Sequence, residues 1–298
     1  MNSVFDIINV PLGYIFRWIY LLVDNYGWTI VLFTLLVKFA MFPLTLKQQR
    51  AMKKTQALQP KLAKLQEKYK YDQEKLNQET MKLYQEEGVN PMGGCLPMLI
   101  QFPILIALYN IIRKPMSYVM MLSDDVITKI HEALIGPVEK FAMIDQIGLA
   151  KAVEQNFDKV QEYVDKVIHF DFAGFLDLSV TPTIAYISQH MEYAIIPIVA
   201  GGTTFLVSYI SSKMNGTANV NAENNPSASS MKMMNYIFPL MTAWFSITLP
   251  AGLGLYWTVS NLFQIGQMLI MDRFITVEIP ASDDDQNHYR TRRKKKKK

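Results

Sequence analysis

The sequence predicts an all-α integral membrane protein with five transmembrane helices, a cytoplasmic helical hairpin and an N-terminal interfacial helix. Half of the 298 residues are hydrophobic, and they gather in nearly uncharged blocks instead of recurring at helix or strand period. The five strongest blocks, of roughly 17 to 22 residues, are long enough to cross a hydrocarbon core. Charged residues are concentrated between these blocks.

The distribution of basic residues predicts the orientation of the chain. Residues 47–90 contain ten Lys/Arg and six acidic residues, whereas residues 115–192 contain five lysines and twelve acidic residues. Because segments rich in Lys and Arg stay in the cytoplasm, the first segment is predicted inside and the second outside. The basic tail is then also cytoplasmic, and five spans put the N-terminus outside.

The expected elements follow one another along the chain without internal repeats. They are an interfacial amphipathic helix (1–24), span 1 (25–46), a cytoplasmic helical hairpin (47–92), span 2 (93–114), an extracytoplasmic helical region (115–192), span 3 (193–213), a cytoplasmic loop (214–232), span 4 (233–249), span 5 (251–272) and a cytoplasmic basic tail (273–298).

Two of these elements leave alternatives open. Apolar residues of 4–23 recur on one helical face, opposite Asp6, Asn9 and Arg17, which is typical of a helix in the membrane interface. A sixth span is the alternative. The segment lacks the basic start of a secretory signal peptide, so we expect it to be retained.

The hairpin, with two leucine-rich stripes, is either a solvated spacer or a docking surface.

Motifs of enzymes and metal sites are absent from the sequence. There is no HExxH, P-loop or GxSxG motif, and His131, His169 and His190 have neither metal-ligand spacing nor a partner nucleophile. The one cysteine, Cys95, allows no intrachain disulfide. We therefore expect no enzymatic activity, no cofactor and no metal.

Lys38 is the most unusual residue, because it lies near the middle of the first span. At ~1.5 Å per residue it is ~13 to 15 Å from either end of the span, which exceeds the reach of its side chain. A lysine at such a depth costs about 2.5 to 3.5 kcal/mol on insertion scales. The surrounding Leu, Ile, Val and Phe residues offset this cost, so the span can still insert.

Three explanations for Lys38 compete: an acidic partner on another span, deprotonation on burial, and a water-filled cavity. No Asp or Glu lies inside any predicted span, which favours the cavity. Polar residues of spans 2 and 5 are its candidate lining: Gln101, Asn110, Tyr256, Trp257, Thr258, Ser260, Asn261, Gln264 and Gln267. Interhelical hydrogen bonding is the alternative role for most of them.

Three sequence blocks occur in order between residues 28 and 272. They are TLLVKFAMFPLTLKQQ with the following LQPKLAKLQEKY, then NPMGGCLPMLIQFPILIALY, then LPAGLGLYWTVSNLFQIGQ. Together they closely resemble the YidC family of membrane protein insertases, which is related to the insertases of mitochondria and chloroplasts. The chain is similar to the short bacterial form that lacks a large outer domain.

The resemblance implies five spans around a hydrophilic groove that opens to the cytoplasm and to lipid and is closed toward the outside. It puts Lys38 in this groove, where many members have arginine, and implies client contacts at Thr34 and Trp257 and a polar groove position at Gln101. Together with the residues argued above, the candidate client-contacting groove is Lys38, Thr34, Gln101, Trp257, Tyr256, Ser260 and Gln264.

The expected function is that of an insertase and chaperone that guides nascent membrane proteins from the ribosome into the bilayer of the bacterial cytoplasmic membrane. The alternatives are a small-molecule anion transporter or channel, and a scaffold of the general secretion channel. That channel and the signal recognition particle receptor are further expected partners. The basic tail is expected to bind ribosomal RNA or anionic lipid through Arg290, Arg292, Arg293, Lys294, Lys295, Lys296, Lys297 and Lys298.

Overall fold

The computed structural model describes residues 6–89, 96–214 and 226–274, and this part of the chain is mostly helical. The helices are α1 (Asp6–Val23), α2 (Tyr26–Ala57), α3 (Gln59–Lys68), α4 (Gln73–Glu86), α5 (Leu96–Arg113), α6 (Pro115–Tyr118), α7 (Asp124–Leu134), α8 (Gln146–Gln155), α9 (Ile184–Ile187), α10 (Ile195–Met214), α11 (Pro226–Thr248) and α12 (Ala251–Phe274). Two short strands, β1 (Asp171–Phe172) and β2 (Leu176–Asp177), pair antiparallel.

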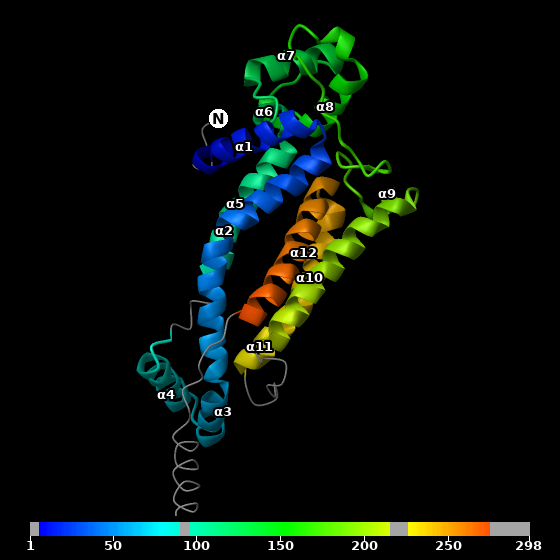
Figure 1. Cartoon of the computed structure of the whole chain (residues 1–298). Coiled ribbons are helices and arrows are strands. Elements are labelled where there is room, and N and C mark those ends of the chain that lie inside the picture. The colour runs from blue at the N-terminus through cyan, green and yellow to red at the C-terminus, as the bar shows by residue number, and fades with distance from the viewer. Residues whose placement is uncertain (1–5, 90–95, 215–225, 275–298) are drawn as a thin grey trace, which may run out of the picture.

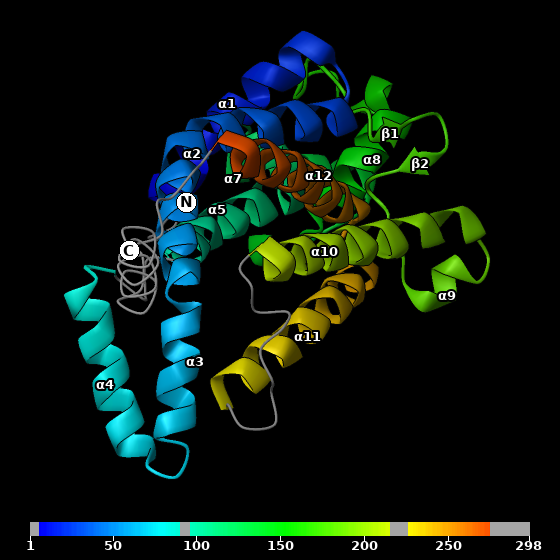
Figure 2. The same cartoon turned by 60° about the horizontal axis from the view of Figure 1, so that its bottom comes forward.

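The long helices α2, α5, α10, α11 and α12 form an elongated bundle (Figure 1). At one end lie α1 and the region from α6 to α9, residues 115–190, which we call the cap. At the other end α3 and α4, residues 59–86, form the hairpin, which stands away from the bundle (Figure 2). Within the bundle, α10 packs most extensively against α11 and α12.

Three helices in the described ranges are long and apolar enough to cross a membrane, judged by length and composition: Asp6–Val23, Tyr26–Ala57 and Met191–Met214. The first of them is α1, for which the sequence predicted an interfacial position. Figure 1 shows α1 lying across the ends of α2 and α5 instead of alongside them. The predicted spans 2, 4 and 5 correspond to α5, α11 and α12, and a count of five spans stays a prediction.

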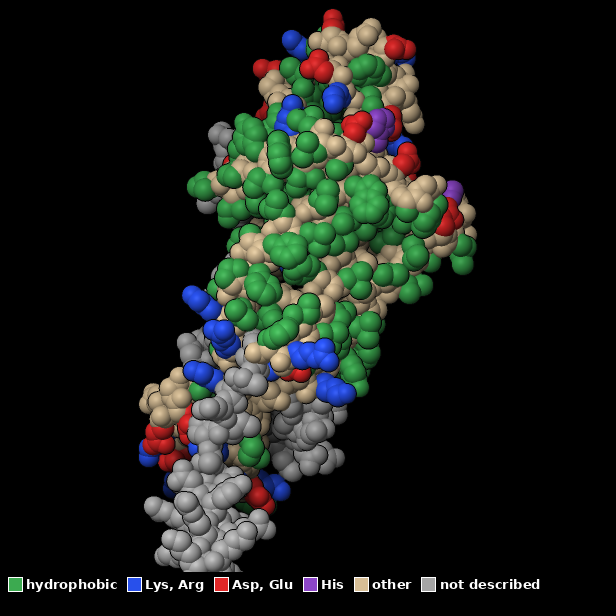
Figure 3. All heavy atoms as spheres, viewed as in Figure 1, with side chains coloured by type: hydrophobic (Ala, Val, Ile, Leu, Met, Phe, Trp, Pro, Cys, Tyr) green, Lys and Arg blue, Asp and Glu red, His purple; other side chains and the backbone are tan. Residues whose placement is uncertain are grey.

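A hydrophobic surface covers the middle of the bundle on the face seen in Figure 3. Large apolar side chains are exposed on several of its helices, among them Trp28, Phe205, Leu240, Trp244 and Leu262. Lys and Arg side chains gather at the border of this surface nearest the hairpin, whereas both charge signs occur on the cap. A continuous apolar surface of this extent is typical of a protein in contact with lipid.

Local sequence explains where the first helices begin and end. The side chain of Asn25 caps α2 by accepting a hydrogen bond from the Trp28 backbone N–H at 3.0 Å. The helix continues to Ala57, beyond residue 46 where the sequence analysis ended span 1, because 47–57 contains no Gly or Pro. Asp72 caps α4 in the same way through the Lys75 N–H.

The main hydrophobic core lies at the cap end. All six buried residues of α2 fall within 26–34, and those of α10 fall within 196–203. They pack with buried residues of α1, α5 and the cap, including Phe16, Leu108, Ile111, Ile127 and Leu149. The bundle is therefore firmly packed at the cap end, and α2 leaves this core after Thr34.

The polar face of α1 turns toward the protein. Arg17 donates to the Val119 carbonyl oxygen at 2.7 Å, and the Tyr118 hydroxyl donates to Asp6 and accepts from Asn9. Burial raises the pKa of Tyr118 above its usual value, so this hydroxyl remains a donor at neutral pH. The opposite face of α1 exposes large apolar side chains, namely Ile7, Tyr14, Trp18, Leu21 and Leu22.

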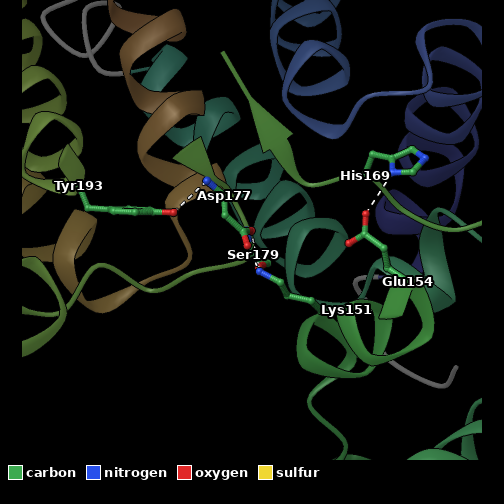
Figure 4. A network of polar contacts seen from close by, with 6 residues as sticks. All are labelled: Lys151, Glu154, His169, Asp177, Ser179 and Tyr193. Carbon is green, nitrogen blue, oxygen red and sulfur yellow. Dashed lines mark hydrogen bonds and ion pairs between the residues drawn. The ribbon is translucent and has the colours of Figure 1, made fainter. Parts of the chain in front are cut away.

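Polar contacts connect segments of the cap with one another, and one of them connects the cap to the start of α10 (Figure 4). Lys151 of α8 forms an ion pair with Asp177, which also accepts from the Ser179 hydroxyl at 2.5 Å. The Asp177 N–H donates to the Tyr193 hydroxyl, just before α10. His169 pairs with Glu154 of α8, with 3.1 Å between Nδ1 and Oε1.

His169 also joins the cap to α2, because its carbonyl oxygen accepts from the Tyr26 N–H at 3.0 Å. Among the described residues no group of three or more His, Cys, Asp or Glu could hold a metal ion. In the structure this histidine therefore has a positioning role at the start of α2.

Candidate functional site

Lys38 is half-buried on α2, one helical turn beyond Thr34, the last buried residue of that helix. Within the described ranges Lys38 makes no hydrogen bond and no ion pair. Asp272, the acid at the end of α12, is paired with Lys53 at 2.9 Å. The first explanation for Lys38, an acidic partner on another span, therefore has no support among the described residues.

Three of the candidate residues come together between α5 and α12. Gln101 donates from Nε2 to the Tyr256 hydroxyl at 2.6 Å, and Ser260 follows Tyr256 by one helical turn on α12. Tyr256 and Ser260 are buried and Gln101 is half-buried. In this structure Gln101 and Tyr256 hold α5 against α12, which is the interhelical role that the sequence left open for them.

Thr34 and Trp257 lie apart from that cluster. Thr34 is only 1 % exposed, and its hydroxyl donates to the Ile30 carbonyl oxygen at 2.6 Å. Trp257 is half-buried and stacks on Phe245 of α11, with ring centroids 6.3 Å apart. Adjacent residues of α12, Tyr256 and Trp257, thus face α5 and α11 respectively.

The polar residues further along α12 differ in their partners. Asn261 donates to the hydroxyls of Thr203 and Thr204 on α10, at 3.1 and 2.8 Å. Gln264 is half-buried. The hydrogen bonds of Asn261 connect α12 to α10. Sequence spacing within α12 could not identify Thr203 and Thr204 as the partners, because they lie on a different helix.

Helices α2 and α12 run side by side in the same direction (Figure 1). Near Lys38, the ring of Phe39 meets Phe263 edge to face, with centroids 5.1 Å apart. Toward the hairpin, Lys53 pairs with Asp272 and also donates to its carbonyl oxygen. Lys38 therefore lies one residue before a contact between these two helices.

A cavity of about 800 Å³ opens at the hairpin end of the bundle, between α2, α10 and α12. Its lining includes Lys53, Tyr209, Lys213, Leu269 and Asp272. The cap end, in contrast, is filled by the main core. A polar chain segment can therefore approach the bundle more readily from the hairpin end.

The arrangement suits reversible attraction of an anionic group. A lysine within an apolar bundle that has no acidic partner in residues 6–89, 96–214 and 226–274 attracts carboxylates strongly because the surrounding dielectric constant is low. The basic tail, Arg290 and Arg292 to Lys298, lies outside the described residues, as does Cys95.

Comparison with known proteins gives consistent matches. The family model described as 60Kd inner membrane protein matches residues 18–278. A membrane protein insertase YidC of Granulibacter bethesdensis is 34 % identical over 90 % of this chain and 38 % of its own length. A membrane protein insertase YidC 2 of Bacillus anthracis is 33 % identical over 83 % of this chain and 72 % of its own length.

An ALBINO3-like protein 2 of the inner membrane, from the chloroplast of Chlamydomonas reinhardtii, is 32 % identical over 87 % of this chain and 52 % of its own length. A solved structure of an active YidC insertase is 25 % identical, covers 89 % of this chain and 46 % of its own, and superposes with a TM-score of 0.48. The chain spans only 35 to 38 % of the length of the first four curated relatives.

Proposed function

The chain belongs to the 60Kd inner membrane protein family. Because the relatives that it matches include proteins named membrane protein insertase YidC, we propose that it is a membrane protein insertase and chaperone. It guides nascent membrane proteins from the ribosome into the lipid bilayer of the bacterial cytoplasmic membrane. It does so by binding and sheltering a polar segment, without covalent chemistry.

The observation that carries this proposal is Lys38, a half-buried cation beyond the packed core without an acidic partner in the described part of the chain. A structural lysine in a membrane would be expected to pair with a carboxylate or to lie at the interface. A cation that is left unpaired is available to a passing ligand. The acidic or polar segment of a client protein is a ligand of suitable charge.

The proposed orientation puts the cap outside the cell and the hairpin in the cytoplasm. Five spans, α2, α5, α10, α11 and α12, surround the route of the client, and α1 lies in the outer interface. The gathering of Lys and Arg at the hairpin border of the apolar surface supports this orientation. The apolar outward face of α1 supports its interfacial position.

In the proposed mechanism, the client enters from the hairpin end and its polar segment advances as far as Lys38. Its apolar segment slides along Trp257 and the apolar faces of the helices into lipid. Burial of that segment in the bilayer supplies most of the driving force. The membrane potential adds about 2.3 kcal/mol per translocated negative charge for each 100 mV.

Thr34, Gln101, Tyr256, Ser260 and Gln264 are proposed to contact the client once it has entered. Thr34, Gln101 and Tyr256 make side-chain hydrogen bonds within the protein, so the client must replace those contacts or slide past them. Exchange of one hydrogen bond for another has a small net free energy. Binding of the client at these residues is therefore weak and reversible, so that the client can be released into the bilayer.

The ribosome is the proposed source of clients, bound through the basic tail and the hairpin. Both carry many lysines, and binding of Lys and Arg to RNA phosphates weakens strongly with salt. The general secretion channel and the signal recognition particle receptor are proposed as further partners.

The test is replacement of the insertase in a bacterial strain whose own insertase can be depleted. Wild type is compared with Lys38→Arg, Lys38→Ala and Lys38→Glu at matched protein levels. Protease accessibility of a small single-span client with an acidic outer tail measures its insertion. We expect wild type and Lys38→Arg to insert the client, and Lys38→Ala and Lys38→Glu to fail.

Equal insertion by all four proteins would leave the insertase function standing and remove Lys38 from its mechanism. Failure of the wild type would reject the function itself. Lys129→Ala is a control, because this exposed lysine lies on α7 in the cap, away from the proposed route of the client. Its loss should leave insertion of the acidic client nearly unchanged.

A further inference from the structure

Gln267 is a buried amide with an unpaired donor. It lies on α12 and is 8 % exposed. Its Nε2 is shielded from solvent and has no hydrogen-bond partner among the described residues. Burying an amide without a partner is unfavourable, because its hydrogen bonds to water are lost and not replaced. Such a group in a packed helix therefore points to a partner that is present only part of the time.

The helix places Gln267 on the face of α12 that is turned to α2 and α5. It lies one turn after Phe263, which contacts Phe39 of α2, and it shares this face with Tyr256 and Ser260 by i, i+3 and i, i+4 spacing. Along the bundle it falls between the Phe39–Phe263 contact and the Lys53–Asp272 ion pair. A chain moving from the hairpin end to Lys38 must pass this level.

The contacts that hold α2 to α12 on either side of Gln267 can open at low cost. On one side is an edge-to-face ring pair that involves the exposed Phe39. On the other is an ion pair whose Asp272 side chain is more than half exposed, and exposed ion pairs contribute little stability. A small separation of the two helices would expose the Gln267 amide.

Asn261, one and a half turns earlier on α12, provides the contrast. It carries the same chemical group, but it donates to two threonine hydroxyls of α10. These two hydrogen bonds connect α12 to α10, which explains why an amide lies at the half-buried position of Asn261. In the part of the chain that the structure describes, Nε2 of Gln267 makes no such contact.

We propose that Gln267 hydrogen-bonds the peptide backbone of the client's polar segment on its way to Lys38, a role that rests on the proposed insertase function. A primary amide carries a donor and an acceptor, and so does each peptide group. The backbone of a segment that has not yet formed a helix carries unpaired groups in every residue. Gln267 binds them irrespective of side chain, whereas Lys38 selects for charge.

The first test compares Gln267→Met with Asn261→Leu, since each variant removes an amide from the same helix while keeping a side chain of similar size. Purified proteins in lipid vesicles are assayed for the initial rate of insertion of a single-span client with an acidic tail. Thermal unfolding in detergent measures stability. Loss of one neutral hydrogen bond should slow insertion about threefold to tenfold in Gln267→Met, with an unchanged or raised melting temperature.

Asn261→Leu should lower the melting temperature and leave the rate per folded molecule unchanged. If Gln267→Met inserts at the wild-type rate, or lowers the melting temperature as much as Asn261→Leu does, the proposed role is wrong. A client whose polar segment is neutral should be slowed by Gln267→Met as much as the acidic client, because the contact is to backbone. Slowing confined to the acidic client would also overturn the proposal.

The second test uses proximity and does not depend on rates. In a Cys95→Ser background that keeps Lys38, single cysteines are introduced as Thr34→Cys, Gln267→Cys and Asn261→Cys, and a client with one cysteine in its polar segment is oxidised during insertion. Disulfides are expected at positions 34 and 267 and not at 261. A disulfide at 34 without one at 267 overturns the role of Gln267 alone. A wild-type protein that inserts no client rejects the insertase function and this inference with it.

Discussion

Gly254 is a residue whose lack of a side chain permits two helices to meet. A Cβ atom at Gly254 would collide with Cγ2 of Ile196, at the start of α10, whereas one at Gly266 of the same helix would meet nothing within 4 Å. Ile196 is β-branched and cannot easily move aside within a helix. The junction of α10 and α12 at the cap end therefore depends on glycine at this position.

We predict that Gly254→Ala destabilises the protein by about 1 to 3 kcal/mol, the usual cost of overpacking a core. Gly266→Ala is the matched control and should stabilise by up to about 1 kcal/mol, because alanine favours the helix where space is open. Circular dichroism during heating in detergent gives both melting temperatures. Equal values for the two variants would contradict the close contact at Gly254.

Some properties of single residues could be predicted from the sequence and others could not. The isolation of Lys38 could be predicted, because an absence of acids within the spans is visible in the sequence. The hydrogen bonds from Thr34 to Ile30 and from Gln101 to Tyr256 could not be predicted, because they depend on side-chain rotamers and on helix packing. The shielded Nε2 of Gln267 likewise follows only from the packed structure.

At the scale of elements, α1 has the unusual property that its polar face contacts protein and its apolar face is exposed. The sequence predicted from periodicity a helix with Asp6, Asn9 and Arg17 on its polar face, but it did not identify Tyr14, Trp18, Leu21 and Leu22 as the exposed apolar side chains. It could not tell which face meets the cap, because the partner Val119 offers only a backbone carbonyl oxygen, which every residue has. In contrast, Asn25 and Asp72 are the N-cap residues of α2 and α4 and contact neighbouring residues in the chain. Their role can therefore be recognised in the sequence.

We predict that Arg17→Met loosens α1 from the cap. A hydrogen bond from a charged donor contributes about 1.5 to 3 kcal/mol, so amide hydrogen exchange in α1 should become about tenfold faster or more. Arg113→Met is the control, because Arg113 donates to Tyr109 on its own helix and its loss should leave α1 unchanged. Equal exchange of α1 in wild type and Arg17→Met would show that the apolar contacts of α1 suffice.

At the scale of the whole molecule, packing is uneven along the bundle. The main core fills the cap end, while the cavity and the exposed Lys213 lie at the hairpin end. A bundle closed at one end and open at the other suits access from one side of a membrane. The Lys and Arg side chains at the border of the apolar surface in Figure 3 support the proposed orientation, in which this open side faces the cytoplasm.

This orientation is tested by labelling whole cells with a membrane-impermeant maleimide, in a Cys95→Ser background. Phe175→Cys lies in the cap and Tyr71→Cys in the turn of the hairpin, where the native side chains are 53 % and 94 % exposed. We expect Phe175→Cys to react in intact cells, and Tyr71→Cys to react only after the membrane is permeabilised. The reverse pattern would invert the proposed topology.

The bend in α2 has a mechanical consequence. Its 32 residues include Pro43, a residue type that kinks helices, and Figure 1 shows that the helix changes direction along its length. The helix is fixed at one end in the core and is joined at the other to α3 through Leu58. Lys38 lies between these two ends. Because Pro43 lies between Lys38 and the hairpin, a force applied to the hairpin would be taken up partly as a change in this bend, and it would move the lysine less than it would along a straight helix.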